Sequence, residues 1–164
     1  MRQALYRMSG VDMTQIDGVG VETVEVVLSE YGPDLSCFPT ENHFIKHATL
    51  APHVPTSGGK PVKKKKRHSA SSRVAEAMRM AALSMRNSQT ALGAFRRMAQ
   101  RLSGDIAVFA TARKILTFIY RLLRWGQPYV DQGAEAYERQ YRHRSIKRLQ
   151  AKAKQLGYQL VPEA

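Results

Sequence analysis

The longest apolar stretch of the chain covers residues 106–123 and is broken by Arg113, Lys114 and Arg121. A membrane-spanning helix needs about 20 residues with few or no charges, so this stretch fits a buried helix better. Extended to Trp125, it is apolar nearly all round, and a Gly-Gln-Pro sequence follows as a stop signal. A helix that is apolar on nearly every side lies in a protein core. The sequence therefore predicts a central helix over residues 106–125.

Apolar residues at helical spacing predict further helices around this one. The expected helices are residues 3–9, 21–31, 40–49, 69–85, 90–102 and 133–156. We found no repeat and no strong strand pattern. The predicted fold is mainly α, with a helix-hairpin-helix element at about 3–31 followed by a helical bundle. An irregular Ser-Gly-Gly and basic loop is expected at about 50–68 and the rest of the helical part at about 69–156, within one domain of residues 1–164.

Charge is distributed unevenly along the chain. The net charge is +13 and the pI is near 10.2, which indicates a polyanionic partner. Residues 1–59 hold three Lys/Arg and seven Asp/Glu, whereas residues 60–164 hold 23 and six. The basic surface is therefore expected in the later part of the chain. The single cysteine, Cys37, excludes an internal disulfide and suits a reducing cytosol.

The segment Pro55-Thr56-Ser57-Gly58-Gly59-Lys60 places a serine hydroxyl on a glycine-containing loop beside a lysine. A phosphodiester under attack needs a nucleophile and nearby positive charge, and Ser57 and Lys60 offer both. The run Lys63-Lys64-Lys65-Lys66-Arg67 follows directly, with Arg73 beyond it. The alternative is that this segment is a solvated turn and the run a solvated charge cluster.

A second glycine motif, Ile16-Asp17-Gly18-Val19-Gly20, separates two expected helices. In a helix-hairpin-helix element, backbone N–H groups at Gly18 and Gly20 would hold a DNA phosphate without reading sequence. Acidic residues crowd this site, so a packing hairpin is the alternative.

The last expected helix mixes aromatic and basic side chains, and either clamps nucleic acid or is a charged surface helix. The cations of residues 96–124 would extend a basic surface if they share a face. His43 and His47 have the spacing of a zinc-binding pair on a helix, but no third ligand is evident.

Short motifs between Ser9 and Pro162 occur in the order that is typical of a known protein family. The landmarks are Ile16 to Gly20, Phe38-Pro39-Thr40 with His43-Phe44, Leu50-Ala51-Pro52, Ser57-Gly58-Gly59-Lys60, Ser88 to Phe95, Ala112-Arg113-Lys114 and Gly126 to Gly133. In this order they resemble the C-terminal domain of the bridge-RNA-guided insertion-sequence transposases, relatives of the Piv-type DNA invertases. One position departs from the family pattern, since Thr49 stands where these proteins usually have glycine.

The resemblance implies that Ser57 attacks a DNA phosphodiester and forms a covalent phosphoserine intermediate. It assigns catalysis to Ser57, and we add Lys60 from its proximity. The expected nucleic-acid-binding residues are Gly18, Gly20, Gly58, Gly59, Lys63, Lys64, Lys65, Lys66, Arg67 and Arg73. The family's magnesium-binding acidic domain is expected to be absent from this chain, which would then be a truncated or split product, inactive alone and without a cofactor of its own.

The predicted function is the DNA-binding, serine-nucleophile half of a transposase that moves an insertion sequence by DNA cleavage and strand transfer. The expected partners are DNA, a guide RNA, and transposase protomers or a separate N-terminal domain, in the bacterial cytoplasm at the nucleoid and not at a membrane. One alternative is a non-catalytic helix-hairpin-helix DNA-binding module. Another is an RNA-associated basic protein.

Overall fold

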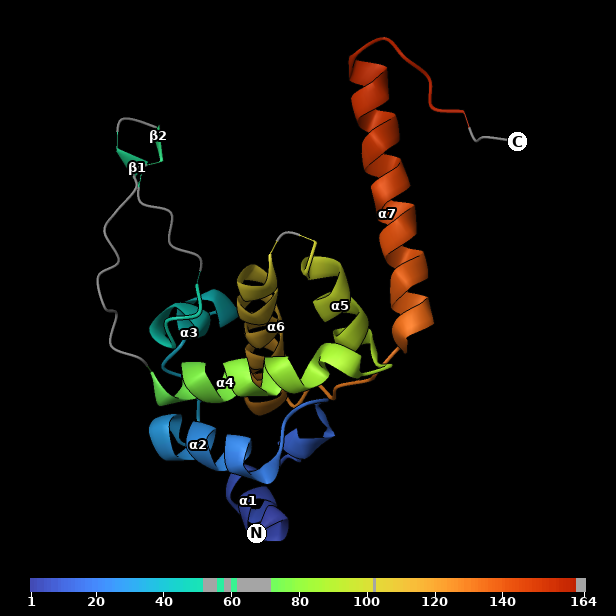
Figure 1. The fold of residues 1–164 in the computed structure, drawn as a ribbon. Coiled ribbons are helices and arrows are strands. Elements are labelled where there is room, and N and C mark those ends of the chain that lie inside the picture. The colour runs from blue at the N-terminus through green and yellow to red at the C-terminus, as the bar shows by residue number, and fades with distance from the viewer. Residues whose placement is uncertain (52–55, 58–59, 62–71, 102, 162–164) are drawn as a thin grey trace.

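The computed structural model describes residues 1–51, 56–57, 60–61, 72–101 and 103–161 (Figure 1). Its elements are α1 (Arg2–Ser9), the 3-10 turn η1 (Met13–Gln15), α2 (Val21–Tyr31), α3 (Glu41–His47), β1 (Thr56–Ser57), β2 (Lys60–Pro61), α4 (Arg73–Ser84), the 3-10 turn η2 (Met85–Asn87), α5 (Ala91–Ala99), α6 (Gly104–Trp125) and α7 (Ala134–Gln155). The prediction of a mainly helical fold is confirmed.

Helix α6 is the centre of the bundle, as its sequence predicts. It packs against α3, α4 and α5, and its fully buried hydrophobic residues are Ala107, Ala112, Ile115, Leu116, Ile119 and Tyr120. The apolar residues at its beginning are less covered, because Ile106 is 52% and Phe109 40% exposed. No helix within the described ranges is long and apolar enough to cross a membrane.

Side chains of α6 also fix the start of α3. The Tyr120 hydroxyl donates a hydrogen bond of 2.7 Å to the carbonyl oxygen of Phe38, just before α3. The next residue, Arg121, donates two hydrogen bonds, of 2.8 and 3.1 Å, to the carboxylate of Glu41. The guanidinium thus holds both oxygens of a residue in the first turn of α3, a geometry that is specific as well as strong.

Hydroxyl side chains define where several helices begin. Thr40 caps α3, Thr90 caps α5 and Ser103 caps α6, each by accepting a backbone N–H of the first turn. Helix α4 begins at Arg73, four residues later than expected, because Ser72 accepts the N–H of Ala75 and is its cap. Residues 69–71 lie outside the described part of the chain.

Helix α3 ends at His47, two residues earlier than expected, because Thr49 has a left-handed φ of 60°. The Thr49 N–H donates to the carbonyl of Lys46, and the Leu50 N–H donates to the carbonyl of Ile45, both at 3.1 Å. These two hydrogen bonds form a Schellman motif, in which the left-handed residue is usually glycine. The position at which Thr49 departs from the family pattern therefore needs a glycine-like backbone.

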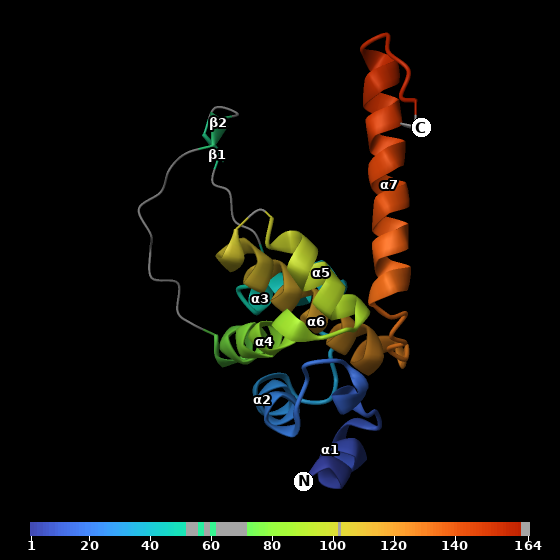
Figure 2. The same cartoon turned by 45° about the vertical axis from the view of Figure 1, so that its right-hand side comes forward.

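Helix α7 projects from the bundle in both views (Figures 1 and 2). It contacts α5, and none of its residues is buried. The hairpin β1–β2 and the C-terminal end of α7 lie on the same side of the bundle, opposite α1 (Figures 1 and 2).

Thr49→Gly is expected to stabilise the protein. A left-handed φ costs a side chain about 1–2 kcal/mol, and glycine returns about 0.5–1 kcal/mol of entropy to the unfolded chain, so the free energy of unfolding should rise by about 0.5–1 kcal/mol. Urea unfolding measures the change. Thr23→Gly, inside α2, is the matched control and should lower stability. A loss of stability in Thr49→Gly would contradict the assigned backbone strain.

Candidate functional site

We call the stretch between α3 and α4 the Ser57 segment. Within it, residues 56–57 and 60–61 form a short antiparallel pair of strands. Strand β1 (Thr56–Ser57) pairs with β2 (Lys60–Pro61), and Ser57 lies opposite Lys60. Residues directly opposite each other in such a pair have Cα atoms about 4.5–5.5 Å apart. The structure therefore brings together the backbones of the two residues that the sequence predicts as catalytic.

The other predicted binding residues of this segment lie outside the described part of the chain. They are Gly58, Gly59, Lys63, Lys64, Lys65, Lys66 and Arg67.

The segment that carries Ser57 is anchored to the bundle where it begins. The Arg113 guanidinium of α6 donates two hydrogen bonds of 3.1 Å, through Nε and Nη2, to the carbonyl oxygen of Leu50. Partial burial lowers the pKa of Arg113 from its usual value, but a guanidinium stays charged at neutral pH. A charged fork on a single carbonyl fixes the direction in which the chain leaves α3.

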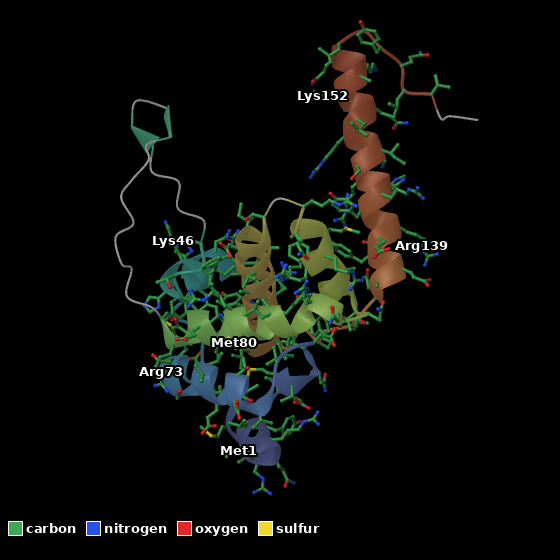
Figure 3. The ribbon with its side chains drawn as sticks, in the orientation of Figure 1. Met1, Lys46, Arg73, Met80, Arg139 and Lys152 are labelled. Carbon is green, nitrogen blue, oxygen red and sulfur yellow. The ribbon has the colours of Figure 1, made fainter. Side chains whose placement is uncertain are left out.

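The segment ends at the start of α4, beside α2. There Ser72 caps α4, and Arg73 forms an exposed ion pair of 3.2 Å with Glu30 at the end of α2. Figure 3 shows Arg73 at the first turn of α4 and Lys46 on α3. Arg73, a predicted nucleic-acid contact, is thus partly engaged with a carboxylate of its own chain.

The Gly18 motif forms a tight turn between η1 and α2. Val19 N–H donates to the carbonyl of Ile16 at 3.0 Å, and Gly18 has a φ of 79°, as a type II turn requires at its third residue. A Cβ at Gly18 would lie 2.9 Å from the carbonyl oxygen of Ala81 on α4. Gly18 is therefore a close packing contact with α4.

Gly20 has a different environment. It is the exposed N-cap residue of α2, and a Cβ there would meet nothing within 4 Å. Asp17, the residue before Gly18, accepts a hydrogen bond of 2.8 Å from the Tyr129 hydroxyl. Burial, and after it this hydrogen bond, raises the pKa of Tyr129. Asp17 thus ties the turn to the segment after α6. These contacts explain why the turn is held against the bundle, while phosphate binding there stays a prediction.

The cations of residues 96–124 do not form one basic face. Arg96 is only 5% exposed, and its Nε and Nη1 have no hydrogen-bond partner among the described residues. Arg113 and Arg121 are engaged with α3 and its flank. Lys114 lies over the ring of Phe118 at 5.1 Å from its centroid, and burial lowers its pKa.

Two arginines of this set instead face α7 across an open groove of about 780 Å³. One side of the groove is lined by Arg97 of α5 and by Arg101 in the turn just after it, and the α7 side by Arg139, Tyr141, Arg142 and Ser145. The sequence indicates basic residues in both regions, but it did not predict that they line one groove. The available signal was the apolar pair Phe95 and Tyr137, whose rings pack edge to face at 6.2 Å and align the two helices.

The two histidines of α3 have separate partners. His43 Nδ1 lies 2.7 Å from the Thr40 hydroxyl, and the His47 ring packs edge to face on Tyr31 and Phe38. Within the described residues, no group of three or more His, Cys, Asp or Glu side chains is placed to hold a metal ion.

The amino-acid sequence matches one known protein family. The sequence model of that family, described as "Transposase IS116/IS110/IS902 family", matches residues 12–97, just over half of the chain. The matched range contains the Gly18 motif, the Ser57 segment and the start of α5, and it confirms the resemblance that the motifs indicate. No curated protein and no solved structure matches the chain.

The two glycines of the turn should respond differently to substitution. Gly18→Ala forces a left-handed side chain against the Ala81 carbonyl and should destabilise the protein by about 2–4 kcal/mol. Gly20→Ser replaces an open N-cap glycine and should change stability by less than about 0.5 kcal/mol. Thermal unfolding of both variants measures this. Equal effects would contradict the packing role of Gly18.

Proposed function

Because this chain belongs to the IS116/IS110/IS902 family of transposases, we propose that it is the part of a transposase that binds DNA and supplies the serine nucleophile. Membership of the family implies DNA binding and a role in moving an insertion sequence. The observation that carries the finer proposal is the pairing of Ser57 with Lys60 across β1 and β2.

In the proposed reaction, the Ser57 hydroxyl attacks the phosphorus of a DNA phosphodiester. A bond forms from the serine oxygen to phosphorus, and one bridging P–O bond breaks. The serine proton passes to solvent, and the departing strand oxygen takes up a proton and becomes a free hydroxyl. Strand transfer then reverses the step, when a hydroxyl of another strand attacks the phosphoserine and releases Ser57.

Lys60 is proposed to stabilise this reaction electrostatically. Negative charge on the non-bridging oxygens must be balanced as the phosphorus is attacked. The backbone pairing of Lys60 with Ser57 supports this proposal. A positive charge close to a serine would also favour its alkoxide form. Anchoring of the segment by Arg113 at Leu50 supports the proposal, because attack by a weak nucleophile depends on orientation.

Magnesium chemistry, which the family resemblance implies, does not fit the described residues of this chain. Its carboxylates there do not gather into a possible metal site, and several are engaged elsewhere, as Glu41 is with Arg121. We therefore assign no step of this chain to a metal and propose that a separate acidic domain holds it.

The test is a covalent adduct. With a matching acidic N-terminal domain added in trans or by fusion, DNA should become attached to the protein through Ser57, as mass spectrometry of the adduct peptide would show. Ser57→Ala should abolish the adduct and leave DNA affinity within about a factor of three, since one hydroxyl contact is worth about 0.5–1 kcal/mol. Thr56→Ala, the neighbouring hydroxyl on β1, is the matched control and should keep the adduct. Attachment at Ser69, Ser71 or Ser72 would refute the assignment.

DNA binding by the basic segment predicts a defined salt dependence. Each phosphate neutralised contributes about 0.9 to the slope of log K against log salt. Replacing Lys63 to Lys66 with alanine should therefore reduce the magnitude of that slope by about 1–3 units. Replacing the same four residues with arginine keeps the charge and should keep the slope. An unchanged slope in the alanine variant would show that the run does not contact DNA.

A further inference from the structure

We propose that the groove between α5 and α7 is a binding site for a single-stranded segment of nucleic acid. This site is separate from Ser57 and goes beyond the function proposed above. It does not depend on whether Ser57 reacts.

The two walls of the groove are held together at the base of α7. The Ala134 N–H donates to the carbonyl of Gln89 at 3.2 Å, and the Ala91 N–H donates to the Asp131 carboxylate at 2.8 Å. The edge-to-face packing of Phe95 and Tyr137 adds an apolar contact one turn further along. The α5 and α7 sides of the groove are therefore joined at its base, while the rest of α7 projects from the bundle (Figures 1 and 2).

The charge of the groove suits a phosphate backbone. Four arginines line it against two carboxylates, Glu135 and Glu138. Of these arginines, Arg97 lies 3.8 Å from Glu138, whereas Arg101, Arg139 and Arg142 have no carboxylate within 4 Å among the described residues. Both glutamates belong to the first turns of α7, so the groove becomes more basic toward its outer end. Figure 3 shows Arg139 in the lower part of α7 and Lys152 near its far end.

An aromatic ring and the size of the groove favour a single strand. Tyr141 lines the groove and is 39% exposed, so an accessible aromatic side chain lies beside the arginines. Cationic grooves with exposed aromatic rings are typical of proteins that bind single strands, because every base can stack. A volume of about 780 Å³ lies within the range of small-ligand sites. Such a volume has room for a few unpaired nucleotides.

The experiment measures fluorescence anisotropy of three labelled probes: an oligothymidylate, an oligouridylate of equal length and a DNA duplex. The groove variant is Arg139→Ala with Arg142→Ala. The matched control is Arg144→Ala with Arg148→Ala, which removes the same charge from exposed positions of the same helix outside the groove lining. The groove variant should weaken single-strand binding about tenfold or more, and the control by about threefold or less. Duplex affinity should change equally in the two.

Tyr141 tests stacking directly. Tyr141→Ala should weaken single-strand binding by about fivefold to a hundredfold, whereas Tyr141→Phe should stay within about twofold of the parent. Arg101→Ala, in the turn after α5, should weaken single-strand binding as the α7 variants do. Because it leaves the sequence of α7 unchanged, it tests the site even if the other variants lose part of that helix. The oligouridylate and oligothymidylate probes distinguish an RNA from a DNA strand.

Three results would overturn the inference. One is an equal loss in the groove and control variants, which would mean general electrostatic attraction. Another is unchanged binding in Tyr141→Ala. The third is displacement of the oligonucleotide by a polyglutamate peptide of equal charge, which would identify a site for an acidic protein. Failure of the Ser57 adduct with an intact groove effect would refute only the proposed reaction.

Discussion

One face of α6 determines where α3 lies, and α3 in turn determines where the Ser57 segment begins. Tyr120 and Arg121 follow Arg113 by about two helical turns, so all three lie on one side of α6. Tyr120 and Arg121 bind the start of α3, and Arg113 binds the Leu50 carbonyl just after its end. Helix α3 therefore runs antiparallel to α6 and is held at both ends. Each anchor joins a side chain to a partner more than sixty residues away, and none is visible as a local pattern.

Helix positions could be predicted well from the sequence because they depend on local signals. Helix α2 has the predicted limits, set by a glycine before Val21 and Gly32 after Tyr31. Helix α6 follows its apolar pattern. Errors occurred where a hydrogen bond decided the boundary: the hydroxyl of Ser72 fixes the start of α4, and the left-handed Thr49 ends α3 early. The family was recognisable because its motifs occur in a fixed order.

The candidate site was less predictable, because it depends on which charges are used inside the fold. Arg96 and Arg101 look equivalent in sequence, yet Arg96 is buried and Arg101 lines an open groove. Gly18 and Gly20 also look equivalent, but Gly18 packs on α4 whereas Gly20 faces open space. Periodicity places a residue on one side of a helix, but it does not state which neighbour covers that side. The α5–α7 groove was missed for this reason.

The uneven charge of the chain has a structural explanation in these contacts. Four of the seven acidic residues in the first 59 positions bind groups of the same chain: Asp12 pairs with Arg2, Glu30 with Arg73 and Glu41 with Arg121, and Asp17 accepts a hydrogen bond from the Tyr129 hydroxyl. These carboxylates neutralise only two cations of residues 60–164, which are Arg73 and Arg121. The remaining Lys and Arg residues keep a strong positive potential, which attracts polyanions and raises their association rate. Carboxylates of the first part thus help to hold the helices on either side of the Ser57 segment, and the arginines of the later part that stay exposed are the ones proposed to hold nucleic acid.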